Sequence, residues 1–283
     1  MRCARPQMNT FCICLDHGIA RAQNSPGTAK FSCSLGIVTL SSRGDNNPMH
    51  ISKNPYRGHR FPPEVISHAV WLYHRFTLSF RDIEELLAVR GIQTSYESIR
   101  RWCMKFPLEY GKALRKHQGR LGDIWYLDEV FISIGCKRQY LWRAVDQDGD
   151  VIDILVQSRR NKGAALRFFR KLFKGQSSMP WKIITDKLRS YQAALREVSP
   201  SLTHITDQYE NNRAEVSHQP TRQQERQMRR FKSSGQAQRF LSFHGLVNNL
   251  FRQQRHLLSA RNYRILRDRA FVAWGQATCV REL

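Results

Sequence analysis

Residues 124–158, IWYLDEVFISIGCKRQYLWRAVDQDGDVIDILVQS, decide the fold of this chain. Three apolar, strand-like runs follow one another within this stretch: 124–134, 138–146 and 150–158. Gly135 lies between the first two runs, and Asp148 with Gly149 lies between the last two; an Asp-Gly pair between apolar runs is a strong hairpin signal. The stretch therefore predicts three consecutive antiparallel strands.

The segments that follow alternate between helical and strand-like patterns. They are a helix at 162–174, a strand at 181–186, a helix at 188–197, a weak strand at 202–206 and a long helical region at 211–257, broken near Pro220 with Gly235 as a second candidate break. Hairpins followed by alternating elements imply a mixed sheet flanked by helices, which makes the fold class α/β. This is the element order of an RNase H-like core, and we place that domain at 123–257.

An all-α unit precedes the sheet, at 54–110. Its three expected helices cover 61–76, a segment from Ser79 to the glycine at position 91, and 95–106. Two short helices joined by a glycine-containing turn, the second with a basic face, are typical of a helix-turn-helix domain. On this hypothesis the last helix contacts DNA through three cations: Arg100, Arg101 and Lys105. An ordinary three-helix bundle with a solvated basic side is the alternative.

The charge of the chain limits its partners. The 283 residues contain 46 Lys and Arg against 23 Asp and Glu, a formal net charge of +23. Phosphate backbones attract such chains through counterion release, so nucleic acid is the favoured partner. No apolar run approaches the length of a membrane span, and the seven cysteines show no CxxC pair. Scattered thiols indicate a reducing cytoplasm, so we expect a cytoplasmic, DNA-associated protein without a membrane partner.

Three further segments lie outside the two main units. Residues 1–48 are rich in Ser, Asn, Gly and Cys without a period, and we expect a disordered or non-native N-terminal extension that ends before Met49. Residues 111–122 are rich in Lys, Arg and Gly and are interpreted as a linker, and 258–283 as a C-terminal helical tail.

Three acidic residues stand where a metal site would need them. Asp128 lies within the first strand-like run, Asp186 ends the run at 181–186, and Glu215 lies near the start of a helix-like run. Carboxylates are the hard oxygen ligands that Mg²⁺ prefers, and two Mg²⁺ ions can act on the attacking and leaving oxygens of a phosphodiester. These three residues are therefore our candidates for both catalysis and metal binding.

Each carboxylate also has a plainer interpretation. Asp128 could form a salt bridge with Arg143 on the next strand, Asp186 could cap the following helix, and Glu215 could complete a capping box. Period-2 alternation places Glu129 on the other face of its strand, so it is interpreted as a bystander. His218 could face the same site, although a structural or exposed histidine is the commoner case.

A basic run follows the third acidic residue. Its arginines are Arg222, Arg226, Arg229 and Arg230. A solvated helix face is the plain interpretation of such a run. Beside a metal site, a phosphate-binding face is the alternative, and we take these four arginines as DNA-binding candidates.

With these residues assembled, the chain resembles transposases of the IS6 (IS26-like) insertion-sequence family. The resemblance rests on YRGHRFPPEVI, SIRRW, WYLDEVF, TDKLRSY and NNRAEVSHQPTRQQERQMRRFKS. It implies an aspartate–aspartate–glutamate (DDE) triad, which by motif is Asp128, Asp186 and Glu215. The spacing between the last two is shorter than is common in the family, which leaves Glu210 and Glu225 as alternatives.

The resemblance also implies the activity. It predicts two Mg²⁺ ions, which Mn²⁺ can replace, binding of the inverted-repeat ends of a transposon, and strand transfer to target double-stranded DNA with cointegrate products in a bacterial host. A homo-oligomer, at least a dimer, is expected because two ends must be handled together. A non-catalytic DNA-binding derivative and an RNase H-like nuclease or resolvase are the alternative functions.

Overall fold

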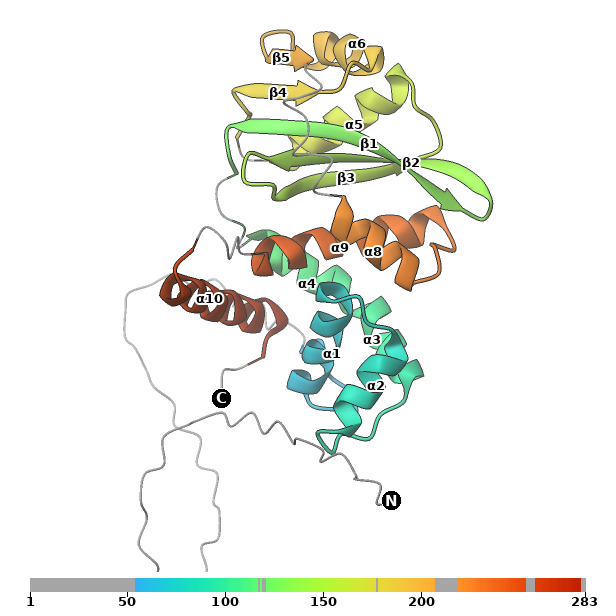
Figure 1. Cartoon of the computed structure of the whole chain (residues 1–283), viewed down its shortest axis with the longest axis vertical. Coiled ribbons are helices and arrows are strands. Elements are labelled where there is room, and N and C mark those ends of the chain that lie inside the picture. Colours follow the sequence, from blue (N-terminus) through green and yellow to red (C-terminus); the bar gives the residue numbers. More distant parts are fainter. Residues whose placement is uncertain are drawn as a thin grey trace, which may run out of the picture. The chain divides into compact units, whose positions relative to one another are not determined.

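Five strands form one mixed sheet in the computed structural model, which describes residues 54–116, 118, 121–176, 178–206, 218–252 and 258–280. The strands are β1 (Ile124–Ile134), β2 (Lys137–Asp146), β3 (Val151–Gln157), β4 (Lys182–Thr185) and β5 (Thr203–Thr206). Their order is β3-β2-β1-β4-β5, with β1, β2 and β3 antiparallel and with β4 and β5 parallel to β1 (Figure 1). This is the RNase H-like arrangement, and it confirms the predicted fold class.

Two helices cover one face of the sheet. They are α5 (Lys162–Lys174), whose N-cap is Asn161, and α6 (Arg189–Val198). Fully buried aromatic rings fill the space between these helices and the strands: Trp125, Trp142, Phe168, Phe169 and Tyr191. Alternate residues of β1 therefore belong to this core, and the intervening ones face the other side.

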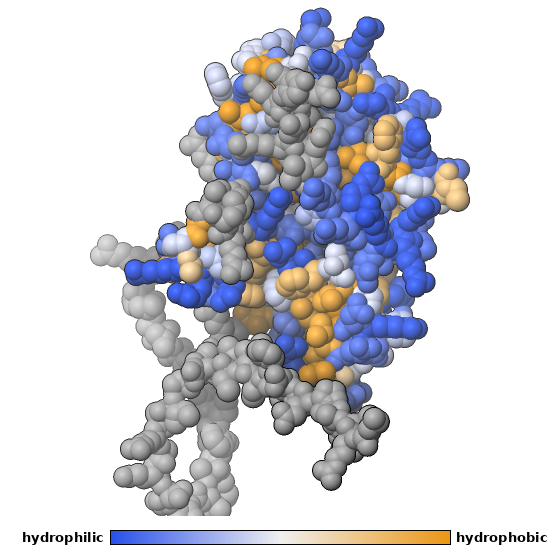
Figure 2. All heavy atoms as spheres, viewed as in Figure 1, coloured by the Kyte–Doolittle hydropathy of each residue, from blue (hydrophilic) through white to orange (hydrophobic). Residues whose placement is uncertain are grey.

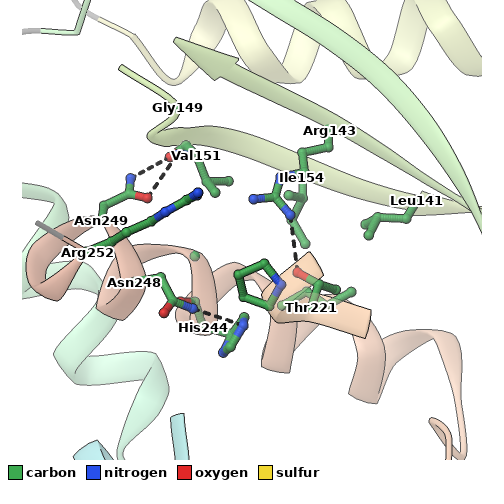
Figure 3. Close-up of a pocket in the computed structure, with 13 residues that line it drawn as sticks. Leu141, Arg143, Gly149, Val151, Ile154, Thr221, His244, Asn248, Asn249 and Arg252 are labelled. Carbon is green, nitrogen blue, oxygen red and sulfur yellow. Dashed lines mark hydrogen bonds between the residues drawn. The ribbon is translucent and has the colours of Figure 1, made fainter. Parts of the chain in front are cut away.

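Helix α9 (Ser234–Phe251) covers the other face. Its Asn249 side chain forms two hydrogen bonds with the main chain of Val151 in β3, accepting from the amide at 2.9 Å and donating to the carbonyl at 2.8 Å (Figure 3). The amide side chain thus satisfies both backbone groups of one strand residue. This fixes the end of α9 against the sheet.

Four N-terminal helices precede the sheet, and two of them, the first and the fourth, pack against the same helix α9. The four are α1 (Pro63–Arg75), α2 (Phe80–Ala88), α3 (Tyr96–Lys105) and α4 (Pro107–Lys116). Ser79 and Asp82 form the expected capping box of α2, and Gly91 has a φ of +76°, which permits the turn towards α3. The three predicted helices are therefore present, each within a few residues of its expected bounds.

Helix α4 corrects the sequence interpretation. Residues 111–122 were expected to form a linker, but 111–116 continue α4. Tyr110, Gly111 and Leu114 are buried. The apolar side of α4 faces α9 and α10 (Ala260–Thr278), and this packing stabilises a helix in a segment that by composition resembles a linker.

The described C-terminal segments are helical. Helix α8 (Gln219–Gln227) begins just before Pro220, which lies in its first turn, where a proline is accommodated without a kink. Helix α10 falls within the predicted tail 258–283 and packs on α4. All described segments belong to one unit, Ser52–Leu283, so the proposed domain boundaries near 110, 123 and 257 stay a prediction.

The predicted extension 1–48 lies outside the described residues. Hydrophilic residues cover most of the face seen in Figure 2. Among the described helices, none is long and apolar enough to cross a membrane.

Candidate metal centre and basic groove

Three carboxylates meet at one edge of the sheet. Asp128 and Glu129 are neighbours in β1, and Asp186 directly follows β4. One oxygen of each lies within 4.8 Å of the others, and all three are buried or half-buried. The structure thus brings together two of the three predicted residues, Asp128 and Asp186, while Glu215 lies outside the described residues.

Glu129, expected to be a bystander, belongs to this cluster. The strand alternation was interpreted correctly, because Glu129 faces the α6 side and accepts a hydrogen bond from Tyr191 Oη at 2.6 Å. The pairing of β1 with β4, however, ends at Leu127 opposite Thr185. Beyond that point no β4 residue separates the two faces of β1, so side chains from both can approach Asp186.

Burial and the neighbouring Arg160 have opposite effects on the pKa of Glu129. The Arg160 guanidinium forms an ion pair with Glu129 and lies 3.5 Å from Asp186 Oδ2. Burial raises the pKa of Glu129 to about 7, and the nearby Asp186 and Asp128 carboxylates act in the same direction. A buried carboxyl with this pKa is costly to ionise without a cation.

Asp186 does not cap α6, because the N-cap of that helix is Leu188 and no side chain caps it. Its Oδ1 accepts a hydrogen bond from the Leu188 amide at 3.1 Å, just before α6 begins at Arg189. Burial raises the pKa of Asp186, with Asp128 adding to the shift. The turn therefore fixes one oxygen, while the other is directed at the cluster.

Asp128 is held by His218, the residue just before α8. Its Oδ2 accepts a hydrogen bond from His218 Nε2 at 2.8 Å. Arg143 is its cross-strand partner, but the buried guanidinium donates to Thr221 Oγ1 at 3.1 Å (Figure 3). The alternative interpretation of Asp128, a salt bridge to Arg143, is not among the ion pairs of the described residues. Burial lowers the pKa of Arg143 to about 9, and the Arg252 cation adds to this.

His218 is a site residue that the sequence interpretation undervalued. Its ring is buried, and burial lowers its pKa despite the hydrogen bond to Asp128. A carboxylate only accepts, so Nε2 is the donor in this bond. The position of the histidine one turn after Glu215 was the available signal.

A groove of about 810 Å³ lies between the β1–β2 hairpin and α8. All four predicted arginines of the basic run line it, together with a fifth from β2: Arg222, Arg226, Arg229, Arg230 and Arg138. Glu225, the alternative third acid, also lines it and accepts from Arg222 Nη1 at 3.0 Å. The arginines outnumber this one acid, so the groove suits an anionic ligand.

The predicted cations of α3 have different surroundings. Arg100 is paired with Glu97 at 2.7 Å, and Arg101 lies 3.5 Å from the same carboxylate with 76% of its side chain exposed. Lys105 Nζ lies 2.8 Å from His59 Nε2. These cations are at the surface of the helical unit, as a DNA-contacting helix requires, and their role stays a prediction.

This chain is similar in sequence to a known domain family and to curated transposases. A family model described as a DDE domain matches residues 122–254. The transposase for the insertion sequence-like element IS431mec of Staphylococcus aureus is 35% identical over 171 residues, which cover 58% of this chain and 75% of that protein. The transposase for insertion sequence element IS257 in transposon Tn4003, from the same species, is 34% identical with the same coverage.

Two solved catalytic cores of retroviral integrases align with about half of this chain. The HTLV-2 integrase catalytic core domain in complex with magnesium aligns with a TM-score of 0.34 at 13% identity, covering 51% of this chain and 94% of that one. The catalytic core domain of BIV integrase aligns with a TM-score of 0.33 at 11% identity, covering 54% and 99%.

Proposed function

Because this chain belongs to the IS6-type family of DDE insertion-sequence transposases, we propose that Asp128 and Asp186 are its catalytic metal ligands. The carrying observation is the convergence of these two carboxylates with Glu129 within 4.8 Å at the edge of the sheet. The protein is a DNA transposase, and the proposal concerns which residues act, with which cation and on which DNA.

The donor set fits Mg²⁺. It consists of hard carboxylate oxygens, and the Glu129 carboxyl, with a pKa raised to about 7 by burial, is the kind of group that a nearby cation stabilises. We propose two Mg²⁺ ions, replaceable by Mn²⁺, with Glu215 as the third catalytic acid; when bound, they activate the attacking oxygen and stabilise the leaving oxygen of a phosphodiester.

Side chains and main chain of this protein position the three carboxylates. The Tyr191 hydroxyl of α6 donates a hydrogen bond to the Glu129 carboxylate, and the Leu188 amide donates one to Asp186. His218 donates to Asp128, which holds the carboxylate in one rotamer. Arg160 offsets the repulsion between Glu129 and Asp186.

DNA binding divides between two surfaces in this proposal. The helix-turn-helix formed by α2 and α3 binds the inverted-repeat ends of the transposon through Arg100, Arg101 and Lys105. The arginines of the groove beside α8 bind the DNA strand near the acidic cluster. Handling two ends requires a homo-oligomer, at least a dimer, and strand transfer to target DNA yields cointegrates.

Carboxylate replacements test the assignment. We expect Asp128→Asn and Asp186→Asn each to abolish Mg²⁺-dependent cleavage and strand transfer while leaving binding to transposon ends within about twofold, measured by gel shift in EDTA. Glu215→Gln should match them, whereas Glu210→Gln, which replaces one of the two alternative third acids, should retain cleavage; the reverse result would exclude Glu215 as the third acid. Normal cleavage by Asp128→Asn removes that residue from the mechanism. Binding without cleavage by the wild-type chain would favour the non-catalytic alternative.

A further inference from the structure

An exposed aromatic ring lies next to the acidic cluster. Phe131 follows Glu129 by two residues on the same face of β1, and 45% of it is exposed. It lies opposite Tyr140, the last β2 residue that pairs with β3, and the β1–β2 hairpin extends past β3 from there (Figure 1). The Tyr140 ring packs against Phe131 from the neighbouring strand, with centroids 5.3 Å apart.

Arginines surround this ring. The guanidinium carbon of Arg138 lies 4.9 Å from the ring centroid, and that of Arg160 lies 6.0 Å from it. Arg222 Nη2 donates to the carbonyl of Phe131 at 2.6 Å. Phe131 and two of these three arginines, Arg138 and Arg222, line the 810 Å³ groove, whereas Arg160 connects the ring to the carboxylates.

Phosphate binding alone does not account for an aromatic residue here. Arginines suffice to bind a phosphate backbone, and the ring adds a flat apolar surface that phosphates do not use. A nucleobase does use such a surface, and it also stacks on guanidinium planes. Bases within a duplex are already stacked on each other, so this surface fits a base that has left the duplex.

We propose that Phe131 and Arg138 form a stacking platform for an unpaired nucleobase of the DNA strand that enters the acidic cluster. The inference rests on the proposed function and adds that the groove binds single-stranded DNA at the reacting position. The base stacks on the ring and the Arg138 plane, while the α8 arginines neutralise the flanking phosphates. Tyr140 supports the ring from the side.

The test compares single-stranded with duplex DNA. Binding of the full chain to a fluorescein-labelled oligo(dT) 20-mer and to a duplex of equal length is measured by anisotropy in EDTA. We expect Phe131→Ala to weaken oligo(dT) binding by roughly 5- to 150-fold, the range for loss of one base–aromatic stack, and duplex binding by less than about threefold. Phe131→Trp should retain oligo(dT) affinity, and Arg138→Lys, which keeps the charge without the plane, should lie between.

The matched control is Trp181→Ala. Trp181 is a large aromatic residue with 69% exposure, next to Asp123 at the opposite end of β1, and its replacement should leave oligo(dT) binding unchanged. A second readout is the fluorescence of 2-aminopurine placed in the oligonucleotide, which stacking on Phe131 quenches and Phe131→Ala restores.

The outcomes separate the two levels of the proposal. Unchanged oligo(dT) binding by Phe131→Ala, or an equal loss for duplex and single strand, overturns the stacking platform but leaves the transposase assignment in place. An equal loss in Trp181→Ala also overturns it, because general surface aromaticity would then explain the effect. If the wild-type chain binds neither DNA, the proposed DNA contacts of the groove fail as well.

Discussion

A buried histidine at the junction of α9 with α1 makes the stability of the fold depend on pH. His244 is buried, and its Nδ1 donates to the carbonyl of His74 in α1 at 2.8 Å. Its Nε2 accepts from Asn248 Nδ2 at 2.9 Å, because Arg75 occupies the Asn248 oxygen (Figure 3 shows the Asn248–His244 bond). Both ring nitrogens are therefore committed to the neutral form.

Protonation of His244 at Nε2 would point its N–H at the side-chain amide N–H of Asn248, so that two hydrogen-bond donors would oppose each other. Burial lowers the pKa of His244 from 6.5 to about 4, opposed by the bond to His74 and aided by the cations Arg143 and Arg75. His74, which faces the same space, is also buried with a lowered pKa. The folded state thus binds this proton less tightly than the unfolded state, so stability falls as the pH drops from 6.5 towards 4.

The magnitude follows from the two pKa values. With 6.5 in the unfolded state and about 4 in the folded state, His244 costs about 2.5 kcal/mol at pH 4.5 and almost nothing at pH 7.5. His244→Gln, which cannot be protonated, should reduce the difference in unfolding free energy between these pH values by about this amount. His74 is present in both proteins, so its contribution largely cancels.

Urea unfolding followed by circular dichroism at pH 7.5, 6.0 and 4.5 measures this difference. We expect His244→Gln to be less stable than the wild-type chain at pH 7.5, through lost packing, but to lose less on acidification. His59→Gln is the comparison variant: this histidine is partly exposed, and burial and Lys105 lower its pKa as well, so its replacement should change the slope in the same direction but by less than His244→Gln. Parallel pH profiles for the wild-type chain and His244→Gln would refute the reasoning.

Three further predictions concern the core, a turn and the acidic cluster. Phe168→Ala empties a fully buried site beneath the sheet and should cost about 3–5 kcal/mol in urea unfolding; a loss below about 1.5 kcal/mol would show that the core refills. Gly149→Ala places a side chain at a φ of +84° in the β2–β3 hairpin and should cost about 1–2 kcal/mol, so an unchanged melting temperature contradicts it. Arg160→Ala leaves Glu129 and Asp186 without their shared cation, and it should lower the melting temperature in EDTA by roughly 2–4 °C. Adding Mg²⁺ should then raise the melting temperature of the variant more than that of the wild-type chain. Equal rises in melting temperature would show that Arg160 and Mg²⁺ do not compete for these oxygens.

Local signals explain why the sheet could be predicted from the sequence. The run 124–134 became β1 without a shift at either end, and the Asp-Gly turn placed β2 and β3 within a residue or two. The bounds of β1 and the position of the β2–β3 turn depend on side-chain alternation and turn chemistry, which residues close in sequence determine. Helix α4 was missed because its stability comes from burying Tyr110 and Leu114 against distant helices, and no short window of sequence contains that information.

Some residues of the candidate site could likewise be identified from the sequence, and others could not. Asp128 and Asp186 could be found because each stands in or at the end of a strand-like run, where a carboxylate is unexpected. Glu129 and Arg160 could not, because their approach depends on where the β1–β4 pairing ends and on a loop that returns across the sheet. Alternation predicts the face on which a residue lies, but not the place where a sheet stops separating its two faces.

Arg160 links the two halves of the proposal, and this makes them separable by experiment. One guanidinium contacts the carboxylates of Glu129 and Asp186 and also lies 6.0 Å from the Phe131 ring. A cation that takes the carboxylate oxygens competes with Arg160, and the displaced guanidinium remains close to the ring and free to contact phosphate. Removing Arg160 should therefore change both Mg²⁺ affinity and DNA binding, whereas removing the Phe131 ring should change DNA binding alone. A Phe131→Ala variant with altered Mg²⁺ affinity would show that the ring acts through Arg160 rather than on a nucleobase.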